Sequence, residues 1–147
     1  LLGFPYVVGS VSDNGSIGAA AQAGTPGFLA ELGQCGRWSP QEVEDYKAAV
    51  RNVLRSLGVI PGAAVQHEVV FLEKMGVTTA TEDGCWYPSV ALDEVVKKGQ
   101  KLGEIRDFFG TMKAEYVADS DGIVLYLVTS LAILTNDPLC AIGVANG

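Results

Sequence analysis

The sequence predicts an α/β region over residues 1–62 followed by a small all-β domain over residues 63–147. The first region combines short apolar runs with one clear amphipathic helix pattern, whereas the second reads as short strands separated by turn residues. The stretch Gly58-Val-Ile-Pro-Gly-Ala-Ala lies between the two regions. Its small and turn-forming residues are typical of a domain boundary.

The clearest element of the first region is a helix over residues 40–57. Ser39-Pro-Gln-Glu42 forms a capping box with proline at the first helical position, and Gly58 stands where helices commonly end. The apolar residues between these signals form a stripe along one side of the helix: Val43, Tyr46, Val50, Val53, Leu54 and Leu57. We expect this stripe to pack against another element.

The other elements of the first region are short. Residues 6–10 read as a strand, 10–15 as a loop and 16–23 as a helix that ends at Gly24. Residues 27–33 are a continuous apolar run between glycines, which predicts a fully buried strand. This order is typical of the edge of an α/β sheet. Because so few elements cannot build a core, we expect the other strands of the sheet to lie outside this chain.

The second region contains seven strand candidates, separated by turn signals such as Asp-Gly, Lys-Gly and Asn-Asp-Pro. These candidates are residues 67–73, 76–81, 85–90, 101–106, 112–118, 122–129 and 139–145. Many short strands with this punctuation indicate a small sandwich or barrel.

A weak internal repeat runs through the second region. Asp83-Gly84 recurs as Asp121-Gly122 at an offset of 38 positions, and residues 99–105 recur as 136–142 at an offset of 37. One gap therefore aligns the two units. Two β units in tandem predict a quasi-symmetric barrel-sandwich domain of the biotinyl/lipoyl type.

Composition limits the partners and the compartment. The net charge of −7 argues against binding to nucleic acid or to an anionic membrane, because both need a basic surface. No apolar run approaches the roughly 20 residues of a spanning helix. Cys35, Cys85 and Cys140 are odd in number and widely spaced, so we expect buried free thiols and a reducing cytoplasm.

The chain begins Leu-Leu-Gly-Phe-Pro-Tyr, with neither an initiator methionine nor the pattern of a signal peptide. We therefore expect a fragment of a longer protein. Strand edges and apolar helix faces that a missing part would cover make self-association into a homo-oligomer an expectation as well.

Glu31 is the candidate for chemistry. It is the only charged residue between Asp13 and Arg37, and it lies inside an apolar segment. Burying an unpaired carboxylate costs several kcal/mol, so such a residue is usually paired, bound to a metal or catalytic. The end of a parallel strand is also where open α/β sheets place their sites. A salt bridge or a carboxylate that points to solvent are the alternatives.

Several motifs resemble the succinylglutamate desuccinylase/aspartoacylase family, which has a zinc carboxypeptidase-like fold. Residues 15–24, followed by Thr-Pro-Gly-Phe-Leu-Ala-Glu-Leu-Gly33, are similar to the end of its catalytic domain. Residues 84–90, 96–110 and 118–124 are similar to its C-terminal β domain. The resemblance implies that residues 1–62 are the C-terminal part of a carboxypeptidase-like α/β domain and that 63–147 form the β domain.

The resemblance also implies a reaction. Family members hold zinc with a His-x-x-Glu pair and a later histidine, and they hydrolyse an N-acyl amino acid or a similar small amide. Glu31 matches the glutamate that acts first as general base and then as acid to the leaving amine. This chain has no His-x-x-Glu, and its sole histidine, His67, is followed directly by Glu68. We therefore expect zinc in the parent enzyme, no metal site in this chain and no hydrolysis by the chain alone.

A second hypothesis is a non-catalytic carrier or interaction module in which the β domain is the working part. Met112-Lys113 has the residues of a biotinylated Met-Lys, but here the pair reads as part of a strand, where an exposed lysine is ordinary. A His-x-x-Glu motif elsewhere in the parent protein would favour the hydrolase over this module.

Overall fold

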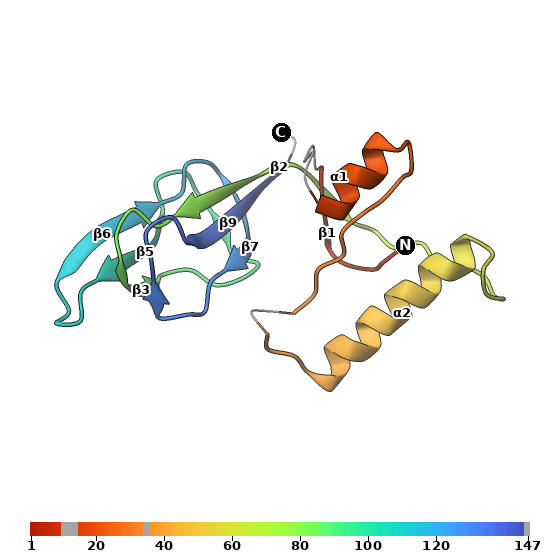
Figure 1. Cartoon of the computed structure of the whole chain (residues 1–147), viewed down its shortest axis with the longest axis horizontal. Helices are drawn as coiled ribbons and strands as arrows, with labels where there is room; N and C mark the ends of the chain where they lie inside the picture. The colour runs from red at the N-terminus through yellow and green to blue at the C-terminus, as the bar shows by residue number, and fades with distance from the viewer. Residues whose placement is uncertain (10–14, 34–35, 146–147) are drawn as a thin grey trace. The chain divides into compact units, whose positions relative to one another are not determined.

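The computed structural model describes residues 1–9, 15–33 and 36–145 (Figure 1). The chain forms two compact units, Leu1–Val70 and Phe71–Gly147. The division at residues 62 and 63 expected from the sequence lies within the first unit, in the irregular stretch between its last helix and the next strand. No helix in the described ranges is long and apolar enough to cross a membrane.

The first unit contains strand β1 (Tyr6–Val8) and helices α1 (Gly15–Gln22) and α2 (Pro40–Ser56). Ser39 caps the start of α2 as predicted, because its hydroxyl accepts a hydrogen bond of 3.2 Å from the Glu42 amide. Gly58 has a φ of 70°, the left-handed conformation that glycine adopts easily after a helix. Local signals therefore fix both ends of this helix.

Asn52 attaches the flanking segments to α2. Its side chain is buried, and its Nδ2 donates to the carbonyl oxygens of Leu1 at 2.6 Å and Val65 at 2.7 Å. Its Oδ1 accepts from the Val65 amide at 2.8 Å. A buried amide with all these bonds made holds the chain before β1 and the chain after α2 to one side of the helix.

The strand predicted over residues 27–33 is not observed. The segment has no regular secondary structure, Phe28 and Leu29 are 60% and 67% exposed, and Glu31 is also exposed. A strand needs neighbours that accept and donate its backbone hydrogen bonds, and within the described residues no strand pairs with this segment. The predicted loop over 10–15 falls mostly outside the described residues.

The second unit is built from two antiparallel sheets, with strand orders β2-β9-β7-β4 and β6-β5-β3-β8. The first of these strands, β2, starts at the last residue of the first unit, where the Val70 amide donates to Pro5. The strands are β2 (Val70–Thr79), β3 (Gly84–Pro88), β4 (Val95–Val96), β5 (Lys101–Arg106), β6 (Met112–Val117), β7 (Gly122–Leu127), β8 (Ala132–Ile133) and β9 (Pro138–Ala145). Within the described ranges, no strand pair joins the two sheets into one closed barrel.

Two strand predictions need correction. The candidates 67–73 and 76–81 are one continuous strand, β2, because Lys74 and Met75 keep their pairing with β9 through the expected break. The two-residue strands β4 and β8 were not predicted, since each is defined only by its pairing with a distant strand. The other predicted strands match β3, β5, β6, β7 and β9 to within a few residues.

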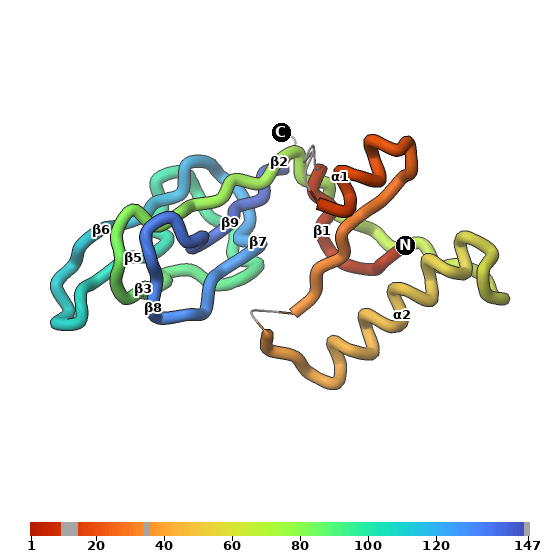
Figure 2. The backbone as a smooth tube through the Cα atoms, in the orientation of Figure 1, coloured from red at the N-terminus to blue at the C-terminus, as the bar shows by residue number. Residues whose placement is uncertain are grey.

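The predicted repeat is confirmed in the pairing of the strands. The short strand of each repeat pairs with the other repeat: β4 with β7, and β8 with β3. Glycine begins β3 and β7 for the same reason in both, since a Cβ on Gly84 would lie 2.5 Å from the Arg106 oxygen and a Cβ on Gly122 would lie 2.4 Å from the Gly143 oxygen. In Figure 2 the short strand β8 lies beside β3.

The turns before β3 and β7 show the same symmetry between the two repeats. The Asp83 carboxylate accepts from the Thr135 amide at 2.6 Å, and the Asp121 carboxylate accepts from the Lys98 amide at 2.8 Å. These hydrogen bonds lower the pKa of both aspartates, with the Thr135 hydroxyl contributing most at Asp83 and the Lys98 amide most at Asp121. Each repeat therefore closes a turn of the other with an aspartate.

The core of the second unit lies between its sheets. Its largest fully buried side chains include Trp86, Leu102, Ile105 and Leu139. Leu102 and Leu139 occupy the same bulge position in β5 and β9, where the register with the neighbouring strand shifts by one residue. The repeat thus extends from the turns into the packing of the core.

Candidate functional site

Glu31 lies in the exposed segment between α1 and α2, one residue after Ala30. The Tyr46 hydroxyl of α2 donates a hydrogen bond of 3.0 Å to the Ala30 carbonyl oxygen. The Tyr46 ring also packs against Phe4, with 5.9 Å between ring centroids. Tyr46 therefore attaches the peptide next to Glu31 to the helix, although the sequence suggested only an apolar role for it.

An apolar groove with a volume of about 280 Å³ lies beside this attachment. It is formed by Leu2, Phe28, Leu29, Ala30, Tyr46, Val50, Val53 and Leu54. The expected packing of the α2 stripe is only partial, because Val50 remains 42% exposed and Leu57 remains 70% exposed. Glu31 thus adjoins an apolar surface that is open in this chain.

The described residues do not provide a set of metal ligands around Glu31. Among them, no group of three or more histidine, cysteine, aspartate or glutamate side chains could hold one. His67 is exposed in the irregular stretch before β2, and a Cβ added to Gly3 would lie 3.4 Å from its ring. A lone exposed carboxylate can accept and release a proton, but it cannot polarise an amide carbonyl on its own.

The lysine of the carrier hypothesis is held in place. Lys113 lies in β6, its Nζ donates to the Asp83 carbonyl oxygen at 2.8 Å, and the Glu82 carboxylate is 3.3 Å away. The exposed aromatic residues of the tight turn before β6 are Phe108 and Phe109, and Lys113 is not in that turn. Lys113 is therefore part of the contact between β6 and the turn before β3.

Two of the three thiols can be placed. Cys85 and Cys140 are free and buried, as predicted, and Cys35 is outside the described residues. Burial raises the pKa of the Cys140 thiol to about 11. A thiol that stays protonated at neutral pH is a poor nucleophile and a poor metal ligand, so Cys140 acts as a small apolar side chain.

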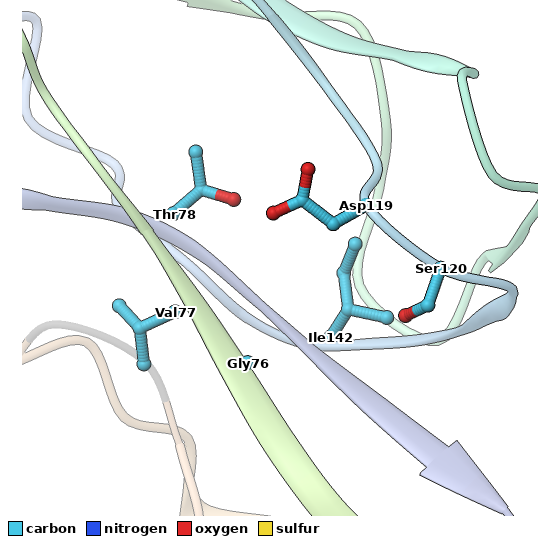
Figure 3. A pocket seen from close by; sticks show the side chains of 6 residues that line it. All are labelled: Gly76, Val77, Thr78, Asp119, Ser120 and Ile142. Carbon is cyan, nitrogen blue, oxygen red and sulfur yellow. The ribbon is translucent and has the colours of Figure 1, made fainter.

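A second pocket, with a volume of about 60 Å³, lies in the β unit and was missed at the level of sequence. It is formed by Gly76, Val77, Thr78, Asp119, Ser120 and Ile142 (Figure 3). The repeat was the signal that could have revealed it. Alignment at an offset of 38 places the small Thr78 where the other repeat has Tyr116.

Solved structures show which proteins share the fold of this chain. No protein-family model and no curated protein sequence matches the chain. Among solved structures, the product-bound ectoine utilization protein EutE (DoeB) from Ruegeria pomeroyi has a TM-score of 0.87 and 26% identity, over 97% of this chain and 46% of that protein. The α/β unit and the two-sheet unit therefore form a known combination that makes up about half of a longer chain.

Two further similar structures are of proteins from the family expected from the motifs. A succinylglutamate desuccinylase/aspartoacylase from Rhodobacter sphaeroides has a TM-score of 0.81 and 22% identity, over 99% of this chain and 47% of that one. A succinylglutamate desuccinylase from Silicibacter sp. TM1040 has a TM-score of 0.83 and 22% identity, over 98% and 46%. The resemblance to the succinylglutamate desuccinylase/aspartoacylase family is thus confirmed in the fold, and the chain spans less than half the length of these relatives.

Proposed function

We propose that this chain supplies the proton-transferring glutamate, Glu31, to a hydrolase that removes the acyl group from an N-acyl amino acid or a similar small amide. The observation that carries the proposal is the fold match over 97% of the chain to a protein with a bound product, together with the family of the related structures. The motif around Glu31 supports the assignment of this residue.

Glu31 would act twice in the reaction. Its carboxylate would take a proton from the water that attacks the amide carbon, and it would return that proton to the departing amine nitrogen as the carbon–nitrogen bond breaks. Because Glu31 is exposed in this chain, the burial expected for it is absent, and the proposed role rests on the motif around it. The hydrogen bond from Tyr46 to Ala30 would hold the adjacent peptide in place during both transfers.

We infer that the parent enzyme uses zinc, which would polarise the amide carbonyl, and that its ligands lie outside this chain. The described residues do not fit a zinc site, since they offer no group of three ligands. The apolar groove beside Glu31 supports the same proposal, because it leaves room for another part of the protein to complete the site. The chain alone would then be inactive.

We also propose that the β unit is a barrel-sandwich of the biotinyl/lipoyl type, on the strength of its interlocked repeats. Its two buried free thiols support a reducing, cytoplasmic location.

The test compares this chain with the full-length protein. Both are assayed for zinc by elemental analysis and for release of free amine from a panel of N-acetyl and N-succinyl amino acids. We expect zinc and hydrolysis only in the full-length protein. Stoichiometric zinc in this chain that is lost in Glu31→Gln or His67→Ala would contradict the proposal, as would a full-length protein that hydrolyses none of the panel.

A further inference from the structure

The repeat allows one position of the β unit to be compared with its own counterpart. Tyr116 of β6 lies opposite Gly103 of β5, and Thr78 of β2 lies opposite Cys140 of β9. Thr78 and Tyr116 differ by 38 positions, and Gly103 and Cys140 differ by 37, which are the offsets of the repeat. Thr78 and Tyr116 therefore occupy equivalent places in the two sheets.

Tyr116 closes its end of the core. Its side chain is 7% exposed, and its ring meets Trp86 edge to face with 5.8 Å between ring centroids. Its hydroxyl accepts a hydrogen bond of 2.9 Å from the Thr81 amide and lies 3.0 Å from the Thr81 hydroxyl. A phenol group is thus an integral part of this half of the unit.

Thr78 leaves the equivalent space empty. The pocket of about 60 Å³ there is several times the roughly 10–15 Å³ that one water molecule requires. Asp119, which stands where the other repeat has Thr81, lies across the pocket, and Figure 3 shows its carboxylate facing the Thr78 hydroxyl. Asp119 is an exposed residue, so its carboxylate is open to a ligand that approaches from solvent.

We propose that this pocket is a binding site for a phenol group. The ring would enter with its hydroxyl end at the place equivalent to the Tyr116 ring, against Ile142, which is the counterpart of Ile105. The rest of the ring would stay outside, because the pocket is open to solvent and smaller than the roughly 150 Å³ of a cavity that encloses benzene. The phenol hydroxyl would donate to the Asp119 carboxylate, and such charge-assisted hydrogen bonds are shorter and stronger than neutral ones. The phenol could be a small molecule or the tyrosine side chain of a polypeptide. This inference does not depend on the function proposed for Glu31.

The probe for this site is p-cresol, which has the structure of a tyrosine side chain. Amide chemical shifts of the ¹⁵N-labelled chain are followed during titration with p-cresol. We expect saturable shifts at Gly76, Asp119 and Ile142. Thr78→Tyr should fill the pocket, weaken p-cresol binding by at least about tenfold and raise the melting temperature. Thr79→Tyr, on the next residue of the strand, is the matched control and should bind p-cresol as the unmodified chain does.

A second comparison keeps the test decisive if Thr78→Tyr does not fold. The unmodified chain should prefer p-cresol to toluene, and Asp119→Asn should reduce that preference. A tripeptide with a central tyrosine and blocked ends distinguishes the sources, because tighter binding than p-cresol indicates a polypeptide and equal or weaker binding indicates a small phenol. Unchanged spectra on addition of p-cresol, equal responses of the Thr78→Tyr and unmodified chains, or no preference over toluene would overturn the proposal.

Discussion

At the scale of single residues, the hydrogen bonds of a few polar side chains decide how segments attach. Asn52 uses both ends of its amide to hold the chain near Leu1 and Val65 against α2. Tyr46 and Tyr116 use a hydroxyl for the same purpose in the two units. These bonds matter because each joins residues that are far apart in the sequence.

Asn52→Ala should destabilise the first unit by about 1–3 kcal/mol, because the substitution removes the hydrogen bonds that this buried amide makes to the backbone of Leu1 and Val65. The measurement is hydrogen exchange of the α2 amides, which should accelerate. Gln41→Ala removes an exposed hydrogen bond to Asp45 and serves as the control, since it should leave exchange in the middle of the helix almost unchanged. Equal exchange in the Asn52→Ala chain would show that the amide is not an anchor.

Cys140 predicts a loss of stability at alkaline pH. Its thiol has a pKa of about 11 in the folded chain against 9.0 for an ordinary cysteine, so the unfolded state loses this proton first as the pH rises. The stabilising contribution is therefore fully present below pH 9.0 and is lost as the pH rises towards 11. Urea unfolding of the second unit at several pH values across this window measures the effect. Cys140→Ala should remove this part of the pH dependence, and an unchanged slope would contradict the assignment.

At the scale of elements, interlocking of short and long strands organises the β unit. Each repeat contributes a two-residue strand, β4 or β8, to the sheet of the other repeat. The glycines at the starts of β3 and β7 let the neighbouring strand approach closely enough for this exchange. The exchange makes the two repeats dependent on each other for their hydrogen bonds.

Gly122→Ala should therefore destabilise the β unit, because its Cβ would lie 2.4 Å from the Gly143 carbonyl oxygen and one backbone would have to move. We expect a decrease of about 1–3 kcal/mol in the free energy of unfolding. Gly76→Ala is the matched control within the same sheet, since nothing lies within 4 Å of the added atom. If both variants unfold at the same urea concentration, close approach is not the reason for glycine at position 122.

The elements that the sequence predicted best are those with local signals. The capping box at Ser39 and the turn residues around the β strands act within a few positions, so their outcome does not depend on distant contacts. The strand over 27–33 was wrong because an apolar run does not reveal whether neighbouring strands are available. The strands β4 and β8 could not be predicted for a similar reason, since only long-range pairing defines them.

At the scale of the whole molecule, the two units differ in how complete they are. The second unit has a core of fully buried side chains, including Leu102, Val124 and Leu139, whereas the first leaves much of its apolar helix face open. The candidate site around Glu31 lies in the first unit, which is the less complete of the two. Motifs predict Glu31 as its proton-transferring residue, and the repeat could have pointed to the pocket at Thr78, but the anchor provided by Tyr46 could not be predicted without three-dimensional contacts.

Hydrogen exchange should report the same contrast. Amides in β5 and β9 are expected to exchange far more slowly than those of residues 27–33, because the strands are buried and paired while the segment has neither protection. Mass spectrometry of peptides from the two units measures this directly. If residues 27–33 were as well protected as the β core, another surface would have to cover the segment. Dilution would remove this protection if the surface belongs to a second copy of the chain, and would leave it unchanged if the surface belongs to the same chain.

The most direct test of the central claim is the effect of Glu31→Gln on turnover by the full-length protein. The amide keeps the size of the side chain but cannot take up the proton, so kcat for the N-acyl amino acid that the protein hydrolyses should fall by about 10²–10⁴-fold while zinc content and folding stay the same. Glu68→Gln changes another exposed glutamate and should leave kcat unaltered. A Glu31→Gln protein that keeps full kcat would show that Glu31 is not the general base.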